Sequence, residues 1–340
     1  MNFRQCPFCR LGYNPNMKRI LSLALLVILA ACAPSRSVTP FPGTSPSKTT
    51  IASSQRYKLH QHFSLINEGD RSPDKQNLWV ALIHDVPPYQ KVLSRQISPD
   101  TYTLVTDEYN NQFAEFDFSD HPANTILSVD IDYEVVVNEL TYDLSNCEGD
   151  LPKEFTRPEL HIESANPQIQ LLSGDLSKDR KSTCEQIQAF YNYVGDELTY
   201  TYNRNDWGAQ ATLGYMGADC TEYSDLMIAL SRAAGIPARY YEGLLYLEDS
   251  NSEVAKTEHA WLDVYLPSIG WAAMDPTLGR LPVFRDTYFA HHTANHIIVT
   301  TGRNPSTLRG ASYWTHLYWP GDSTRIRVEA KEWEIERVDE

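Results

Sequence analysis

Apolar and polar residues alternate over one long stretch in the first half of the chain. Between positions 127 and 137 every second residue is apolar, and all but one of the residues between them are polar; the apolar set is Leu127, Val129, Ile131, Tyr133, Val135 and Val137. A period of two is typical of a strand with one buried face. Shorter runs of the same kind occupy 57–66, 78–84, 101–106 and 112–118. Short strands separated by turn residues predict an all-β, sandwich-like domain over residues 56–146.

Two later segments have the spacing of amphipathic helices. The first follows a capping-box pattern at 182–185. The second is predicted over 221–234, and Gly235 and Pro237 end it. Its apolar residues share one face: Tyr223, Leu226, Met227, Leu230 and Ala234. Residues 147–181, which contain several prolines and polar residues, are interpreted as a connector between the β domain and these helices.

A strand is predicted over 258–266, because its side chains alternate between an aliphatic set and a second set that includes His259. A turn signal at 267–270 and a return strand over 271–275 complete a hairpin, which ends before Pro276.

The register of this hairpin decides whether His259 and Asp275 lie on one face. Side chains alternate with period two, so a simple two-residue loop at 268–269 separates them. A three-residue loop that pairs Leu266 with Gly270, or a bulge, brings them together. We expect one of these two solutions.

Cys220 falls at the start of the second predicted helix, where unpaired N–H groups and the helix dipole favour a thiolate. Taken singly, Cys220, His259 and Asp275 are more often a buried thiol, a satisfied imidazole and a turn cap. Together they are the parts of an activated cysteine nucleophile. Asp275 would fix the imidazole tautomer, and the other ring nitrogen would face the thiol.

Four motifs around these residues resemble the core of the transglutaminase-like superfamily. They are Gly-x-x-Cys at 217–220, Arg-Ala-Ala-Gly-Ile-Pro-Ala-Arg at 232–239, His-Ala-Trp at 259–261 and Gly-Trp…Asp-Pro-Thr at 270–277. The resemblance implies an α+β, papain-like catalytic core over 182–300, with Cys220 as nucleophile, His259 as base and Asp275 as the residue that orients it. Residues 301–340 are expected to add C-terminal strands that pack on this core.

Two further groups of polar residues are candidates for other roles. Trp207 and Gln210 precede the cysteine, and either could donate to an oxyanion as in papain-like sites. A pair of histidine ligands for a metal ion could come from His291, His292 and His296, but the sequence indicates no third ligand. No calcium loop of recognisable spacing is present either. We expect no metal and no cofactor.

The chain has no acidic residue before Glu68. Within this part, a short basic segment that begins at Met17 is followed by an apolar segment that ends at Ala31. We interpret residues 1–31 as a signal region whose true start is Met17, followed by the lipobox-like cysteine Cys32. Residues 32–55 then form a lipidated, Pro/Ser/Thr-rich tether. These features predict an extracytoplasmic protein, anchored by lipid to a bacterial membrane. The Cys-x-x-Cys pair at 6–9 would be lost with the signal, which weakens a rival assignment as a thiol oxidoreductase.

The formal net charge of the whole chain is -15, which argues against nucleic-acid binding. Export also implies an oxidising compartment, in which Cys147 and Cys184 could form a disulfide and leave Cys220 free; the sequence gives no geometry for this pairing.

The leading hypothesis is an enzyme that cleaves amide bonds of a protein or peptide through an acyl-thioester, as a peptidase or amidase. A transglutaminase that passes the acyl group to an amine acceptor uses the same three residues. A non-catalytic binding module that retains the fold is the rival from another class.

Overall fold

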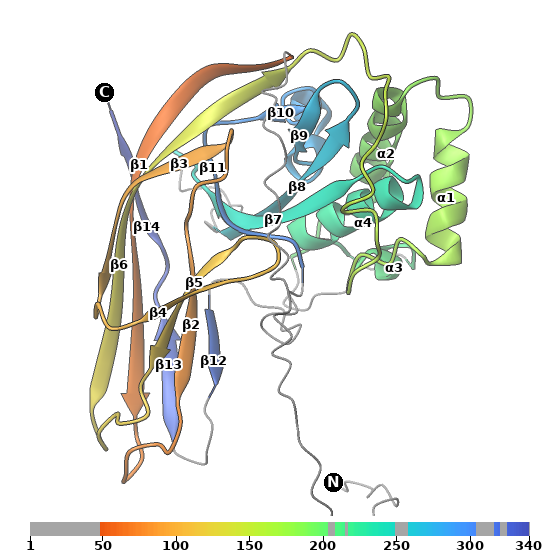
Figure 1. The fold of residues 1–340 in the computed structure, drawn as a ribbon. Helices are drawn as coiled ribbons and strands as arrows, with labels where there is room; N and C mark the ends of the chain where they lie inside the picture. Colours follow the sequence, from red (N-terminus) through yellow and green to blue (C-terminus); the bar gives the residue numbers. More distant parts are fainter. Residues whose placement is uncertain are drawn as a thin grey trace, which may run out of the picture. The chain divides into compact units, whose positions relative to one another are not determined.

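The computed structural model describes residues 48–202, 208–214, 217–248, 258–303, 316–319 and 325–339. The chain forms two compact units, and the described residues all belong to the second, Ser45–Glu340. Figure 1 shows three antiparallel sheets in this unit and a group of helices beside one of them.

The largest sheet is built on two long strands, β1 (Thr49–Asn67) and β6 (Ile126–Tyr142), which pair along almost their whole length. Its strand order is β10-β6-β1-β13, and β14 also pairs with β1 while β3 pairs with β6. The shorter strands are β3 (Gln90–Ser98), β10 (His291–His292), β13 (Ile326–Ala330) and β14 (Glu334–Val338). The alternation read from the sequence is visible in β6, because Val129, Ile131 and Val135 are fully buried.

The second sheet has the order β12-β2-β5-β4. Its strands are β2 (Asn77–Leu82), β4 (Thr103–Thr106), β5 (Gln112–Asp117) and β12 (His316–Trp319). Phe113 and Phe116 of β5 share one apolar core with Phe63 of β1 and Val129 of β6. The prediction of a sandwich-like β domain is therefore confirmed.

The third sheet, in the order β11-β7-β8-β9, carries the helices. Its strands are β7 (Ala238–Leu245), β8 (Glu258–Leu266), β9 (Gly270–Met274) and β11 (His296–Thr301). The helices are α1 (Pro167–Ser177), α2 (Thr183–Glu197), α3 (Ala209–Thr212) and α4 (Cys220–Ala233), and two 3-10 turns follow β9, η1 (Leu278–Arg280) and η2 (Pro282–Phe284). Leu226 and Leu230 of α4 share a core with the aliphatic face of β8, as expected for an α+β papain-like core.

The opposite face of this third sheet is buried as well. Tyr241, Trp261 and Ile298 form a small core with Tyr89 and Leu140, which come from the β domain. The alternation along 258–266 predicts one aliphatic, core-facing side for β8, because the second set contains polar and aromatic residues. Contact with the β domain covers that second side.

The C-terminal strands differ from their predicted place. Residues 301–340 were expected to pack on the catalytic core, but β13 and β14 pair with β1, and β12 pairs with β2. Strand β1 is 19 residues long and needs hydrogen-bond partners on both of its edges. The last strands of the chain provide them along the edge that β6 does not occupy.

Two predicted boundaries also shift. Strand β1 begins at Thr49, inside the segment 32–55 that was interpreted as a flexible tether. The predicted connector, 147–181, contains helix α1, whose first turn is capped by the Asn166 side chain and begins with Pro167. Among the described residues, no helix is both long enough and apolar enough to cross a membrane.

Candidate active site

Cys220 is the first residue of helix α4, and its position is fixed by the cap that precedes it. The Asp219 carboxylate accepts from the Thr221 N–H at 3.1 Å, while the Glu222 carboxylate accepts from the Asp219 N–H at 3.0 Å. This capping box makes Asp219 the N-cap, so the helix begins at the cysteine. The half-buried thiol therefore lies at the positive end of the helix dipole.

The hairpin β8–β9 brings His259 and Asp275 to one face. Leu266 pairs with Gly270 across a three-residue loop, which is one of the two solutions expected from the sequence. Gly270 has a φ of 100°, a conformation that favours glycine. In this register Asp275 continues on the face that carries His259, and the His259 Nε2 lies 2.7 Å from Asp275 Oδ2.

Backbone groups hold the other carboxylate oxygen of Asp275. Its Oδ1 accepts from the N–H groups of Thr277 at 2.9 Å and Leu278 at 3.0 Å. Burial alone would raise the pKa of Asp275, but the charge and hydrogen bond of His259 outweigh it and hold that pKa well below its usual range. The side chain is therefore a carboxylate, which only accepts hydrogen bonds.

Helix α2 fixes the backbone at this point. The Tyr191 hydroxyl lies 3.2 Å from the carbonyl oxygen of Asp275. Gly279 is required beside it, because an added Cβ would lie 1.7 Å from the same hydroxyl. The helical period of α2 places Tyr191 on its buried face but does not predict this contact.

His259 joins the carboxylate to the thiol. Burial lowers its pKa, but the Asp275 charge, the Asp275 hydrogen bond and a side-chain hydrogen bond with Cys220 together raise the pKa of His259 to about 10. Since Nε2 is used by Asp275, Nδ1 is the nitrogen left for the thiol. The structure thus brings Cys220, His259 and Asp275, all named from the sequence, into one chain of contacts.

His296 is a fourth member of this cluster that sequence reasoning did not assign to it. Its Nε2 lies 3.2 Å from Asp275 Oδ2, the oxygen that also meets His259. In the sequence His296 was weighed only as a possible metal ligand. Its place at the start of β11, next to β7 in the sheet, could not be read from local spacing.

A buried ion cluster supports α4 behind the thiol. The Arg303 guanidinium lies 3.2 Å from Asp225 of α4 and 3.3 Å from Glu242 of β7, and it covers the Tyr240 ring at 4.5 Å. Burial raises the pKa of Tyr240 well above its ordinary value, and Cys220 adds to the shift. This cluster links α4, which begins at Cys220, to the inner strand β7 of the sheet.

The two oxyanion candidates have different outcomes. Trp207 lies outside the described residues. Gln210 is an exposed residue of α3, and its backbone N–H donates to Glu163 at 3.1 Å. That N–H is already used, so an oxyanion role for Gln210 stays a proposal for its side chain alone.

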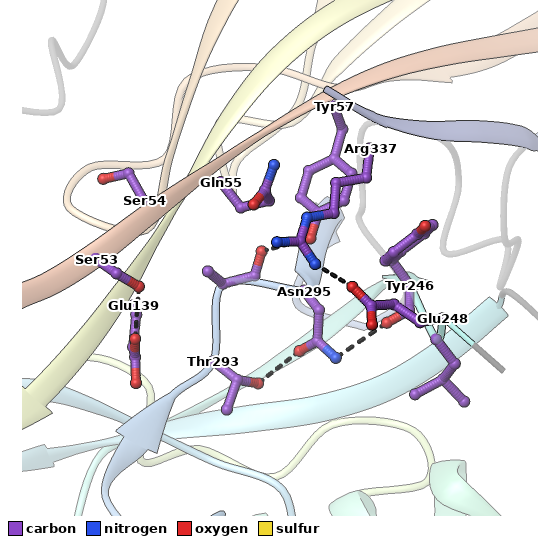
Figure 2. Close-up of a pocket in the computed structure, with 12 residues that line it drawn as sticks. Ser53, Ser54, Gln55, Tyr57, Glu139, Tyr246, Glu248, Thr293, Asn295 and Arg337 are labelled. Atoms are coloured by element: carbon purple, nitrogen blue, oxygen red, sulfur yellow. Dashed lines mark hydrogen bonds and ion pairs between the residues drawn. The ribbon is translucent and has the colours of Figure 1, made fainter. Parts of the chain in front are cut away.

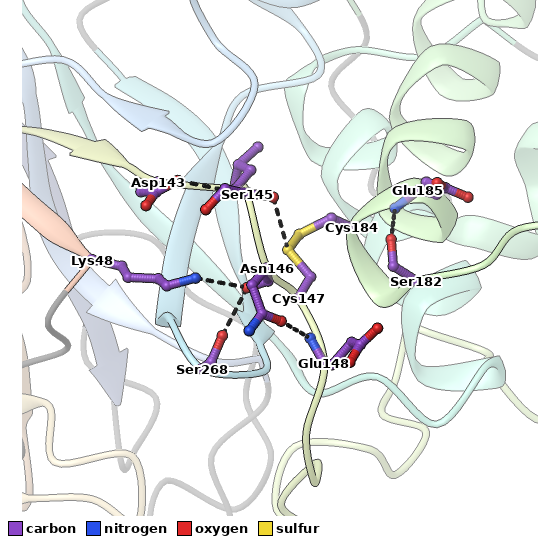
Figure 3. Close-up of a disulfide and its surroundings, with 11 residues drawn as sticks. Lys48, Asp143, Ser145, Asn146, Cys147, Glu148, Ser182, Cys184, Glu185 and Ser268 are labelled. Carbon is purple, nitrogen blue, oxygen red and sulfur yellow. Dashed lines mark hydrogen bonds between the residues drawn. A yellow bond between two sulfur atoms is a disulfide. The ribbon is translucent and has the colours of Figure 1, made fainter.

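Cys147 and Cys184 are joined in a disulfide, with a Cα–Cα distance of 5.7 Å (Figure 3). The bond ties the segment that follows β6 to the first turn of α2. The neighbouring Asn146 carbonyl accepts from Lys48 at 3.1 Å and from Ser268 at 2.7 Å, which adds the β8–β9 loop to the same joint. Of the cysteines in the described part of the chain, Cys220 alone is free.

Two clusters of the described residues have ligand atoms close enough together to hold a metal ion. They are His259, Asp275 and His296 in the site, and His60, His62 and Asp130 on the β domain. In the first cluster the same atoms are hydrogen-bonded to one another at 2.7 and 3.2 Å. Those contacts already satisfy the carboxylate, so we build no step of the chemistry on a metal.

A cavity of about 640 Å³ is lined in part by the residues that directly precede His296 in the chain (Figure 2). Thr293 and Asn295, which contact the His296 ring, form part of its lining, together with Tyr57 of β1 and Tyr246. The Asn295 amide donates to the Tyr246 carbonyl at 3.0 Å. Two residues that contact His296 therefore also line this cavity.

Residues 171–276 match the family model described as the Transglutaminase-like superfamily. This part of the chain is therefore a transglutaminase-like domain. The match begins in α1 and ends just after Asp275, so it covers Cys220, His259 and Asp275 and stops before His296.

One curated relative is the uncharacterized protein YebA of Bacillus subtilis (strain 168), 28% identical over 147 residues. The match covers 37% of this chain and only 20% of the relative, so the chain spans a fifth of that protein's length.

Among solved structures, a proposed cysteine protease from Cytophaga hutchinsonii is similar, with a TM-score of 0.56 and 16% identity. The similarity covers 84% of this chain and 92% of the other. At this identity it shows a shared fold, which includes the β domain as well as the transglutaminase-like core. The periplasmic domain of TgpA from Pseudomonas aeruginosa is also similar, with a TM-score of 0.34, 15% identity and coverage of 71% and 96%.

Proposed function

We propose that this protein is a cysteine enzyme that cleaves amide bonds through an acyl-thioester. One observation carries the proposal: the Cys220 thiol contacts an imidazole, His259, whose other nitrogen is held by the buried carboxylate of Asp275. Thiol, imidazole and carboxylate in this order form the constellation of an activated nucleophile.

The chemistry follows from the protonation states. The Cys220 thiolate attacks the carbonyl carbon of the substrate, and a C–S bond forms. The C–N bond then breaks as His259 gives its Nδ1 proton to the leaving amine. A water molecule, deprotonated by the now neutral His259, attacks the thioester and releases a carboxylic acid. Cys220 leaves as the thiolate, and His259 is again protonated.

Hydrolysis and transamidation share the first half of this cycle. In the second half the acyl group passes either to water or to a primary amine, and access to the cleft decides which nucleophile arrives. We propose hydrolysis of a protein or peptide amide as the main outcome, with transfer to an amine acceptor as the alternative. Incubation of a peptide amide with and without an added primary amine, followed by mass spectrometry of the products, separates the two.

We propose further that the enzyme acts outside the cytoplasm, held to a bacterial membrane by lipid on Cys32. The disulfide between Cys147 and Cys184 supports this location, because such bonds persist in oxidising compartments. Cys32 and the signal region lie outside the described residues. Mass spectrometry of the protein from a membrane fraction, for a lipid-modified Cys32 at the new N-terminus, tests the anchor.

The central experiment compares the wild type with Cys220→Ala. Turnover of generic peptide amides should be lost in the variant, and iodoacetamide should alkylate the Cys220-containing peptide of the wild type at mildly acidic pH. His259→Ala should slow that alkylation. Equal alkylation of the wild type and His259→Ala would argue against the thiol–imidazole pair and leave a non-catalytic binding module as the better account.

A further inference from the structure

The Asp275 carboxylate serves two imidazoles with one oxygen. Its Oδ2 lies 2.7 Å from His259 Nε2 and 3.2 Å from His296 Nε2. We propose that His296 is a positioning residue of the catalytic site: it donates from Nε2 to Asp275 and so shares the carboxylate charge with His259. The proposal rests on the proposed function and deepens it.

The direction of this hydrogen bond follows from the protonation of Asp275. The carboxylate carries no proton, so the His296 Nε2 must bear the hydrogen. Burial lowers the pKa of His296, and the nearby His259 lowers it further, although Asp275 acts in the opposite direction. Burial is the largest of these effects, so the pKa of His296 lies below its ordinary value.

Two polar groups hold the second ring nitrogen. The Thr293 hydroxyl lies 2.8 Å from His296 Nδ1, and it also donates to the Asn295 Oδ1 at 2.7 Å. The Asn295 Oδ1 lies 3.1 Å from the same nitrogen. Its amide is fixed in this orientation because Nδ2 donates to the Tyr246 carbonyl. Thr293, at the edge of the cavity in Figure 2, thus holds the far side of the ring.

Packing keeps the His296 ring in place. The residue is 3% exposed, and its ring meets the Trp261 indole edge-on at a centroid distance of 4.9 Å. His296 also begins a strand that pairs with β7, where it lies opposite Leu245. A ring held on two nitrogens and one face has little freedom to leave Asp275.

The titratable groups that face this cluster come from several elements. Cys220 comes from α4, His259 from β8 and Asp275 from the end of β9, while Tyr288, His291 and His292 come from the segment before β11. Burial lowers the pKa of His292 to about 3, so this ring stays neutral. The charge that His296 can influence is therefore that of the His259–Asp275 pair.

Charge sharing predicts how the site changes without His296. A donor on Oδ2 disperses the negative charge of Asp275, which leaves less of it to stabilise the His259 imidazolium. Without that donor His259 holds its proton more tightly and becomes a weaker acid toward the leaving amine. The loss of the hydrogen bond also lets the carboxylate move. Both effects slow the reaction.

Three substitutions separate positioning from packing. His296→Leu fills the space without a donor. His296→Gln keeps a donor near the place of Nε2, and His296→Asn keeps an amide that is too short to reach Asp275. For each protein we would measure kcat/KM on a peptide amide and the rate of Cys220 alkylation between pH 5 and pH 11, with circular dichroism to identify the range in which the fold persists.

We expect His296→Leu and His296→Asn to lose about 10- to 100-fold in kcat/KM, which corresponds to one hydrogen bond to a charged group. The alkaline inflection that reports His259 should move to higher pH in both. His296→Gln should restore most of the activity and the inflection of the wild type. Equal losses in all three variants with an unmoved inflection would overturn the proposal, and so would a His296→Leu protein as active as the wild type.

His62→Leu is the matched control, because His62 also meets an aspartate at 2.7 Å, but on the β domain. This variant should keep the kcat/KM and pH profile of the wild type. The two proposals fail differently: an inactive wild type whose Cys220 is not alkylated faster than a free thiol rejects the cysteine enzyme itself. An active wild type that is insensitive to His296 rejects only the positioning role.

Discussion

Two regions of the molecule place a thiol or hydroxyl, an imidazole and a carboxylate in a row. In the transglutaminase-like core, a thiol, His259 and Asp275 follow one another. On the β domain, the Ser64 hydroxyl lies 2.9 Å from His62 Nε2, and His62 Nδ1 lies 2.7 Å from Asp130. Both imidazole–carboxylate distances are 2.7 Å. The hydrogen-bond distance therefore does not distinguish an active site from a surface cluster.

Burial distinguishes the two regions. The side chains of His259 and Asp275 are 6% and 3% exposed, whereas those of His62 and Asp130 are 17% and 38% exposed. Water screens the exposed pair, and such pairs contribute little. In the core, low dielectric strengthens the same contact and allows it to change protonation.

The backbone around the nucleophile makes the second difference. Ser64 lies near the C-terminal end of β1 and pairs with Ser128 on one side and Glu329 on the other. At this position both edges of the strand are engaged in the sheet. Cys220 begins a helix, where the first N–H groups have no partner within the helix and can meet a developing oxyanion. An active nucleophile thus needs nearby backbone N–H groups that have no partner within a helix or sheet, as well as a base.

The largest expected effect comes from Asp275→Asn. Burial would then be opposed by Cys220 alone, so the pKa of His259 should fall well below its value in the wild type. We expect a loss on the order of 10⁴-fold in kcat, as for other triads that lose their carboxylate. Steady-state kinetics on a peptide amide measures it.

Asp130→Asn is the control, with no expected change in kcat. The distinction between the buried cluster and the β-domain cluster would be wrong if this variant lost activity as Asp275→Asn does. It would also be wrong if a fluorophosphonate probe labelled Ser64 in the wild type.

The free energies of unfolding of Asp275→Asn and Asp130→Asn should also differ, but by less than their activities do. Removal of the charge from the buried pair should cost about 3 kcal/mol, the low end for broken buried pairs, because His259 can lose its proton. Asp130→Asn should cost less than about 1 kcal/mol. Urea unfolding at pH 7 gives both free energies, and equal costs would contradict the role given to burial.

Alkaline pH should weaken the core pair. The pKa of His259 is raised to about 10 in the folded protein. Its contribution to stability is therefore fully present below the ordinary histidine pKa of about 6.5 and is lost as pH rises through about 10. Amide turnover should fall over the same alkaline range, since the leaving amine needs the His259 proton.

Cys220→Ala sharpens this prediction, because the thiol helps to raise the pKa of His259. An imidazole NMR titration should place the pKa of His259 lower in Cys220→Ala than in the wild type. An unchanged titration would show that the thiol and the ring do not interact.

The smallest expected effect is that of salt on the β-domain pair. Raising the ionic strength from 0.1 to 1 M shortens the screening length from about 10 to about 3 Å. The stability difference between the wild type and His62→Gln should then shrink by a few tenths of a kcal/mol. The difference between the wild type and Asp275→Asn should change less, because that pair is buried.

Local patterns predicted much of the catalytic region. The helix start at Cys220 follows from its cap and from the apolar spacing of α4, and the pairing of Leu266 with Gly270 follows from loop length and strand parity. Both depend on neighbours within about 20 residues, where geometry is fixed by hydrogen-bonding rules. The sandwich-like domain could be predicted for the same reason.

The C-terminal strands could not be placed in this way. Residues 326–338 alternate like many strands, and alternation does not state which edge a strand will join. Their partner, β1, lies more than 250 residues earlier in the chain. Only the unpaired edge of β1 in the assembled sheet selects them.

The sequence by itself determined which residues could do chemistry and which short elements carry them: a capped helix that starts at Cys220, and a hairpin whose parity joins His259 to Asp275. Tertiary structure decided that His296 would meet the same carboxylate and that the cluster would be buried, whereas His62 and Asp130 stay near water. The reason is physical. Local geometry follows from backbone hydrogen bonds between near neighbours. The burial of a side chain and the presence of a charged group beside it depend on surfaces that form only when distant segments pack together.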